Sequence, residues 1–159
     1  MILFISLTVV LLVLITVGFI ITYSSPSSEW SDADIALVQI NDVQFSAAVA
    51  ASASKQRVVL SSYDSLDTFE AMLFVFDRAE KRTFWMKGMS FPIDIIWIND
   101  GVIVDITHNL QPPSHGIDIN TARSAQPASL VLEVGGGISS QHNISVGDPV
   151  SITTLEESK

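Results

Sequence analysis

Residues 93–107 read Ile-Asp-Ile-Ile-Trp-Ile-Asn-Asp-Gly-Val-Ile-Val-Asp-Ile-Thr. The apolar run before Asn99 is short and rich in β-branched and aromatic residues, which favours a strand over a helix. Asn-Asp-Gly is a strong tight-turn signal because Gly101 can adopt φ > 0. Residues 102–107 are therefore expected to return as the second strand of a buried β-hairpin.

Other short segments on both sides of this hairpin have the same β character. Strands separated by turns are predicted at 35–40, 43–49, 72–76, 82–86, 129–134 and 149–154. Residues 77–81 and 135–137 are expected to form turns, and a short helix is expected at about 55–61. About seven or eight short strands with one short helix predict an all-β domain, a small sandwich or barrel.

The N-terminal segment is different in kind. Residues 1–23 carry no charged side chain, and residues 2–21 are nearly pure Ile, Leu, Val and Phe. A run of about 20 apolar residues can span a hydrocarbon core roughly 30 Å thick. The segment has no basic start and no Ala-x-Ala-like exit, so an uncleaved single transmembrane helix is predicted at 1–23 rather than a signal peptide. A linker is expected at 24–34, the domain at 35–154 and a polar tail at 155–159.

Charge and cysteine content limit the partners of the chain. All 17 Asp and Glu residues and all 8 Lys and Arg residues follow the apolar segment, and the net charge is −9. Nucleic acid requires clustered positive charge, so no nucleic-acid partner is expected. The absence of Cys excludes disulfides and thiolate metal sites. With a short N-terminal tail and a long C-terminal domain, the expected location is the cytoplasmic membrane, with the soluble domain outside the cytoplasm.

Five motifs follow one another along the domain. They are Met-Leu-Phe-Val-Phe at 72–76, Thr-Phe-Trp-Met-Lys at 83–87, Pro-Ile-Asp-Ile-Ile-Trp-Ile at 92–98, Leu-Val-Leu-Glu at 130–133 and Val-Gly-Asp-Pro-Val at 146–150. Together they resemble the domain-of-unknown-function 192 family over roughly residues 35–154. The resemblance implies a compact, jelly-roll-like all-β sandwich that is often exported or anchored. It implies no activity, because the biochemical role of that family is unassigned.

Asp94 is the most informative charged residue. Strand alternation places it on one face with Ile96 and Ile98. A buried unpaired carboxylate is very costly, so Asp94 needs a cation, backbone N–H donors or a proton. Lys87 is the nearest cation in the sequence. A structural Lys–Asp pair, or an Asp that caps loop amides, is favoured over a perturbed acid in a ligand pocket.

Glu133 is the second carboxylate in an apolar strand. It could form a pocket with Asp94, as hydrolases of sugars require, although a solvated or Arg-paired strand residue is the commoner role. These residues make up a candidate polar cluster, functional or structural: Arg57, Lys87, Asp94 and Glu133.

The polar stretch 108–124 contains two consecutive prolines and exceeds the usual hairpin connection of about 2–5 residues. We expect it to fold over one end of the sandwich and to border residues 87–91. A candidate binding surface lies in and near it: Trp85, Met86, His108, His115 and Asp118. A strand pair with one side in the core is the simpler interpretation of Trp85 and Met86. The His and Asp spacing matches no compact metal motif, so neither a metal nor another cofactor is expected.

No nucleophile elbow, catalytic Cys or His-Glu-x-x-His motif occurs in the sequence. The leading hypothesis is a membrane-anchored, non-catalytic binding or accessory module with an envelope ligand or protein as its partner. The alternative is an envelope-associated, hydrolase-type enzyme that uses Asp94, Lys87 and Glu133. Two converging carboxylates would favour the enzyme, whereas an Asp94 held by backbone donors would favour the module.

Overall fold

The computed structural model of the chain describes residues 35–52, 64–114 and 120–155. The predicted anchor at 1–23, the linker at 24–34 and the expected helix at 55–61 lie outside these ranges. No helix among the described residues is long and apolar enough to cross a membrane.

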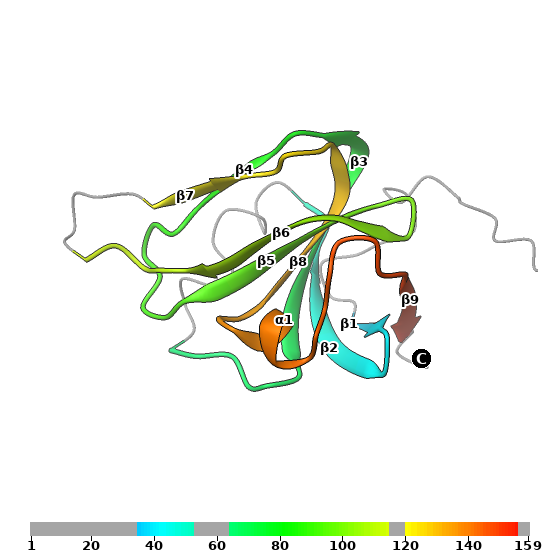
Figure 1. The fold of residues 1–159 in the computed structure, drawn as a ribbon, viewed down its shortest axis with the longest axis horizontal. Helices are drawn as coiled ribbons and strands as arrows, with labels where there is room; N and C mark the ends of the chain where they lie inside the picture. The colour runs from blue at the N-terminus through cyan, green and yellow to red at the C-terminus, as the bar shows by residue number, and fades with distance from the viewer. Residues whose placement is uncertain (1–34, 53–63, 115–119, 156–159) are drawn as a thin grey trace, which may run out of the picture.

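The described residues form a mostly β structure with one short helix (Figure 1). The strands are β1 Ile35–Ile40, β2 Val43–Ala50, β3 Glu70–Glu80, β4 Thr83–Trp85, β5 Ile93–Asn99, β6 Val102–Leu110, β7 Thr121–Arg123, β8 Ala128–Gly135 and β9 Val150–Leu155, and the helix is α1 Ile138–Gln141. The all-β class is therefore confirmed. The turn between β5 and β6 also forms as expected, with φ of 50° at Asp100 and 72° at Gly101.

Seven strands form one sheet in the order β6-β5-β8-β3-β2-β1-β9, and β4 and β7 form a separate two-stranded ribbon. Within the large sheet β2 and β3 run parallel, whereas the other pairs are antiparallel. The sheet curls so that its two edges approach at one end. There the N–H of Ile103 donates to the carbonyl of Asp148 at 3.0 Å, and the N–H of Val150 donates to that of Gly101 at 2.8 Å. The edges do not join in a continuous ladder, so the fold is an open sandwich rather than a closed barrel.

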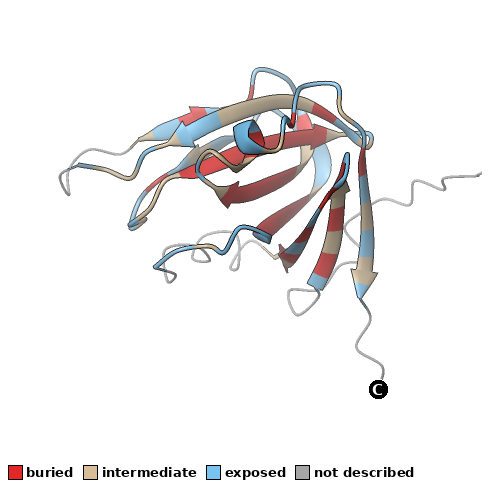
Figure 2. Cartoon of the chain, turned by 60° about the horizontal axis from the view of Figure 1, so that its bottom comes forward, coloured by how far each residue is buried: buried red, intermediate tan, exposed pale blue. Residues whose placement is uncertain are grey.

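Two hydrophobic clusters lie on the two faces of the curled sheet. The inner cluster fills the concave side and takes residues from both edges, among them Ile103 and Val150. The outer cluster lies between the convex face of β3, β5 and β8 and the β4–β7 ribbon, and Trp97 belongs to it. Figure 2 shows the buried residues concentrated on the central strands. The central strands are therefore apolar on both faces, as the continuous run at 72–76 predicts.

The local structure differs from the expectations at several places. Residues 77–80 are not a turn but the end of β3, where a register shift between Val75 and Glu80 lets the strand continue beyond the core. The strand at 102–107 continues to Leu110, because pairing with Ile93 extends it into polar sequence. The expected turn after β8 does form, at Gly136 and Gly137, but it leads into a helix, α1, that was not expected, and β7 was not expected either.

Phe84 attaches the β4–β7 ribbon to the sheet. Its ring makes edge-to-face contacts with Phe74 and Trp97, at centroid distances of 5.0 and 5.3 Å. The next residue, Trp85, points away from the core and is 59% exposed. The two neighbouring aromatic residues of β4 therefore have opposite roles.

We expect Phe84→Ala to lower the free energy of unfolding by on the order of 2–3 kcal/mol, because it removes a packed ring and its aromatic contacts. Trp85→Ala, the matched control, should change it by less than about 0.5 kcal/mol. Urea denaturation of both variants measures the difference, and equal losses would contradict the ribbon packing described above.

Candidate functional site

Asp94, in β5, is fully buried and accepts four hydrogen bonds. Its Oδ1 accepts the N–H of Asn109 at 2.7 Å and the N–H of Gly137 at 2.9 Å. Its Oδ2 accepts the N–H of Ser139 at 2.8 Å and the hydroxyl of the same residue at 2.5 Å. Backbone amides and one hydroxyl therefore solvate the carboxylate in place of water.

A β-bulge brings Asn109 to Asp94. Ile93 pairs with Leu110 and Ile95 with Thr107, so β6 has one more residue than β5 at this point. Asn109 adopts φ of 48°, a left-handed conformation that Asn tolerates better than most residues. The bulge changes the local direction of the strand and leaves an N–H free to donate to the side chain opposite.

The glycine-rich turn after β8 brings the other two amides. Gly137 is the N-cap of α1 with φ of 88°. Because glycine has no side chain, it makes no side-chain capping hydrogen bond. The first amides of a helix lack partners within the helix. Asp94 supplies an acceptor from a different strand, and thereby joins β5, β6 and the start of α1.

Two structural roles were predicted for Asp94. In the structure it caps loop amides and does not pair with Lys87. Lys87 is exposed beyond the end of β4. Among the described residues the one salt bridge joins Arg78 and Glu80, at 3.4 Å. Asp94 is therefore a buried structural carboxylate that needs no cation.

His108 and Ser139 extend the network around Asp94 to the surface. The Nδ1 of His108 lies 3.0 Å from the Ser139 hydroxyl oxygen. Because that hydroxyl donates to Asp94, it accepts from an Nδ1–H of His108. Ser139 is fully buried between the two side chains, so the order of the three residues differs from that of a catalytic triad, in which the serine is terminal and reachable.

Glu133 lies on the other face of the sheet. It pairs with Ile95 of β5 and Met72 of β3, so it faces the outer cluster, whereas the neighbouring pair of Asp94 and Val134 faces the inner one. The residue is 6% exposed, and within the described ranges no hydrogen bond or ion pair holds its carboxyl group. Burial raises the pKa of Glu133 to about 8, because the charged form loses its solvation. At neutral pH its carboxyl group is mostly protonated.

The two carboxylates therefore do not converge. Residues that alternate along one strand project to opposite faces, and the register places Asp94 and Glu133 on opposite sides of β5 and β8. A glycosidase needs both carboxyl groups on the same side, about 5–10 Å apart around one bond. The paired-acid arrangement of the alternative hypothesis is not present.

The described residues of the candidate binding surface do not all lie on one surface either. Met86 is buried in the outer cluster, whereas Trp85 is exposed. His108 is exposed on β6, and Arg57, His115 and Asp118 lie outside the described residues. No group of three His, Cys, Asp or Glu side chains in the described part of the chain could hold a metal ion.

The loop after β6 does approach the predicted neighbours. Its described ends are held together by the side-chain amide of Asn120, which donates to the carbonyl of Gln111 at 2.9 Å. The carbonyl of Asn120 accepts the N–H of Met86 at 2.9 Å. The base of the loop therefore lies beside the end of β4, although the loop is shorter than residues 108–124 because strands occupy both of its ends.

Beyond the predicted residues, the outward face of the β4–β7 ribbon presents several polar side chains around Trp85. Thr83 pairs with Arg123 and Trp85 with Thr121, and all four side chains are exposed. Sequence analysis missed β7 because three residues are too few for a periodic pattern. It also missed Ser139, whose only signal was a polar residue just after three glycines.

Fold and site together define a small all-β domain built around a buried carboxylate and lacking a paired acid–base site among its described residues. The chain belongs to the DUF192 family of uncharacterized proteins, whose model matches residues 36–152. No curated protein matches it.

Two solved structures are similar to this chain. One is a protein of Sinorhizobium meliloti 1021 described as a "putative transcription regulator", with 26% identity and a TM-score of 0.67, over 77% of this chain and 96% of that one. The other is a protein of unknown function from Novosphingobium aromaticivorans DSM 12444, with 27% identity and a TM-score of 0.69, over 81% of this chain and 94% of that one.

The partners of Asp94 lead to a prediction about stability. Asp94→Ala should destabilise the domain by on the order of 2–4 kcal/mol, because one buried and two partly buried amides lose their acceptor. Asp94→Asn should cost about half as much, since one oxygen still accepts two amides while the new NH2 group opposes the N–H of Ser139. Lys87→Ala is the control and should be neutral. A loss in Lys87→Ala equal to that in Asp94→Asn, measured by urea denaturation, would contradict the capping role.

The raised pKa of Glu133 leads to a prediction about pH. The unfolded state releases this proton near pH 4.5, whereas the folded state retains it up to about pH 8. Stability is therefore lost as pH rises between these values, by on the order of 5 kcal/mol. Glu133→Gln has no such proton, so its stability should exceed that of the parent chain increasingly from pH 5 to pH 8. A constant difference across this range in denaturation experiments would show that Glu133 is not buried as described.

Proposed function

We propose that this chain is a membrane-anchored binding or accessory module with its domain outside the cytoplasm, rather than an enzyme. One observation carries the proposal. Asp94 is saturated by donors that belong to the fold, and Glu133 lies on the opposite face, so neither carboxyl group is placed to work with the other. A non-catalytic role is what remains when the two strongest acid–base candidates serve the core.

The anchor is proposed from residues 1–23, whose length and lack of charge suit a membrane span. The domain begins with β1 a short distance later, and Ile35 pairs with Leu155 of β9. Strands β1 and β9 lie on a different side of the domain from the β4–β7 ribbon (Figure 1). This arrangement supports a domain that is tethered on one side and presents the ribbon on another.

The contact surface of the module is proposed to be the outward side of that ribbon. We call it the ribbon face and define it by Thr83, Trp85, Lys87, Thr121 and Arg123. Exposed Trp is uncommon in surfaces without a role and is enriched where proteins bind partners. Because Phe84 already attaches the ribbon to the core, Trp85 is not required for folding.

Cell fractionation tests the anchor. The full-length chain should sediment with membranes and keep its first residue, and external protease should digest the domain in intact cells. Mass spectrometry that found a mature start near residue 24 would overturn the anchor.

A hydrolysis assay tests the non-catalytic role separately. Purified membranes that carry the chain should release no more reducing ends from envelope polysaccharide than membranes without it. A release that disappears in Glu133→Gln or Asp94→Asn, with folding retained, would establish the enzyme instead.

A further inference from the structure

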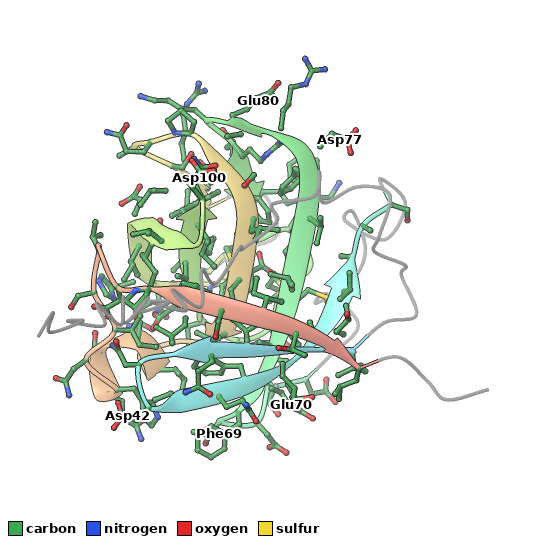
Figure 3. All side chains as sticks on the ribbon, turned by 90° about the vertical axis from the view of Figure 1, so that its right-hand side faces the viewer. Asp42, Phe69, Glu70, Asp77, Glu80 and Asp100 are labelled. Carbon is green, nitrogen blue, oxygen red and sulfur yellow. The ribbon has the colours of Figure 1, made fainter. Side chains whose placement is uncertain are left out.

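The basic residues of the described chain are not spread evenly. Five Lys and Arg residues are described, and they lie at the end of β3, in the connection to β4, in the turn after β4 or on β7: Arg78, Lys81, Arg82, Lys87 and Arg123. Eleven Asp and Glu residues are described. Figure 3 shows Asp77, Glu80 and Asp100 at one end of the domain and Asp42 and Glu70 at the other. Asp105 also lies near β7, because its carboxylate accepts the N–H of Ala125. An otherwise acidic domain thus has one basic region.

Most of the acidic groups near this region are already occupied. Glu80 pairs with Arg78 at 3.4 Å. The carboxylate of Asp105 accepts the N–H groups of Ile106 at 2.9 Å and Ala125 at 2.6 Å. No salt bridge among the described residues involves Lys87 or Arg123, so these two exposed cations are available to a ligand.

The cations of this region have two roles. Arg82 lies 3.6 Å from the centroid of the Phe76 ring and donates to the carbonyls of Arg78 and Ala128, so it belongs to the structure. Arg123 and Lys87 are exposed on the ribbon face. They are the cations that a ligand can reach.

The ribbon face has a defined spacing. Side chains on one face of a strand recur every second residue, about 7 Å apart. Arg123 lies across from Thr83, and Trp85 follows Thr83 by two residues on the same face, across from Thr121. Lys87 is exposed in the turn that follows β4. The indole therefore has one cation diagonally across the ribbon and a second in the adjoining turn, with the hydroxyls of Thr83 and Thr121 beside it.

We infer that the ribbon face binds a linear acidic polysaccharide, with a sugar ring stacked on Trp85 and its anionic groups paired with Arg123 and Lys87. The inference rests on the proposed binding function and adds the class of ligand. A pyranose ring has an apolar C–H face that packs on an indole, and its hydroxyls match the two threonines. Carboxylate groups that recur along the chain match cations separated by a ring.

Two other polyanionic partners fit this face less well. A membrane surface would favour apolar residues beside the Trp, but the neighbours are two Thr and two cations, and the proposed anchor enters on a different side. Single-stranded nucleic acid also stacks on aromatic side chains, but it needs a continuous basic groove, and acidic residues occupy the rest of the described domain. Both partners are outcomes of the test below.

The test uses the full-length chain in nanodiscs of zwitterionic lipid, titrated calorimetrically with oligogalacturonate, hyaluronate and an uncharged malto-oligosaccharide. At least one acidic polymer should bind, with an affinity at least tenfold higher than that of the uncharged one. Trp85→Ala should weaken binding at least tenfold, and Trp85→Phe should restore part of it. Raising the salt from 50 to 500 mM should weaken binding several-fold, because ion pairs contribute.

Phe69→Ala supplies the matched control, because Phe69 is also an exposed aromatic residue, at 54%, but lies at the end of Asp42 and Glu70 (Figure 3). It should leave the affinity unchanged, whereas the double variant Lys87→Glu with Arg123→Glu should abolish binding. The inference is overturned if neither acidic polymer binds better than the uncharged one. It is also overturned if oligo-dT or anionic vesicles bind more tightly with the same dependence on Trp85. Neither outcome would change the results of the cell fractionation or of the hydrolysis assay, so the proposed function is tested independently of this inference.

Discussion

The carboxylate of Asp94 is the constraint on which the rest of the domain depends. It accepts amides from the β6 bulge and from the first turn of α1, at 2.7 to 2.9 Å. Without an acceptor the buried amide of Ser139 would be unpaired at a cost of about 1–3 kcal/mol, and the partly buried amides of Asn109 and Gly137 would also lose a partner. The bulge, the glycine-rich turn and the short helix therefore all rely on this one side chain to accept hydrogen bonds from their amides.

The other face of the same strands holds a second buried carboxyl group, in a different environment. Glu133 lies among apolar residues without donors in the described part of the chain, and its pKa rises to about 8. Asp94 accepts four hydrogen bonds from groups of the fold, whereas burial raises the pKa of Glu133 and favours its neutral form. Two carboxyl groups in one sheet thus have different environments because their faces offer different partners, and the sheet between them keeps them chemically independent.

The ribbon face, unlike the core, presents side chains that a partner can reach. The β4–β7 ribbon is joined to the sheet through Phe84 and exposes Trp85 one residue later. A rigid support with an exposed aromatic residue and two cations suits recognition better than chemistry. The fold itself is compatible with many functions, so the proposed binding role rests on these side chains and their register.

The sequence by itself determined the local features: the bounds of β1, the β5–β6 turn at Asp100 and Gly101, the burial of Asp94, and the family. Each depends on residues near one another in the chain, through alternation, turn geometry and the cost of burying charge. Only the tertiary structure decided that β4 pairs with β7, that β2 runs parallel to β3, and that amides rather than Lys87 satisfy Asp94. It also decided that Glu133 lies on the opposite face from Asp94, among apolar residues of the outer cluster. These depend on the register between distant strands, and a shift of one residue reverses the face of every side chain.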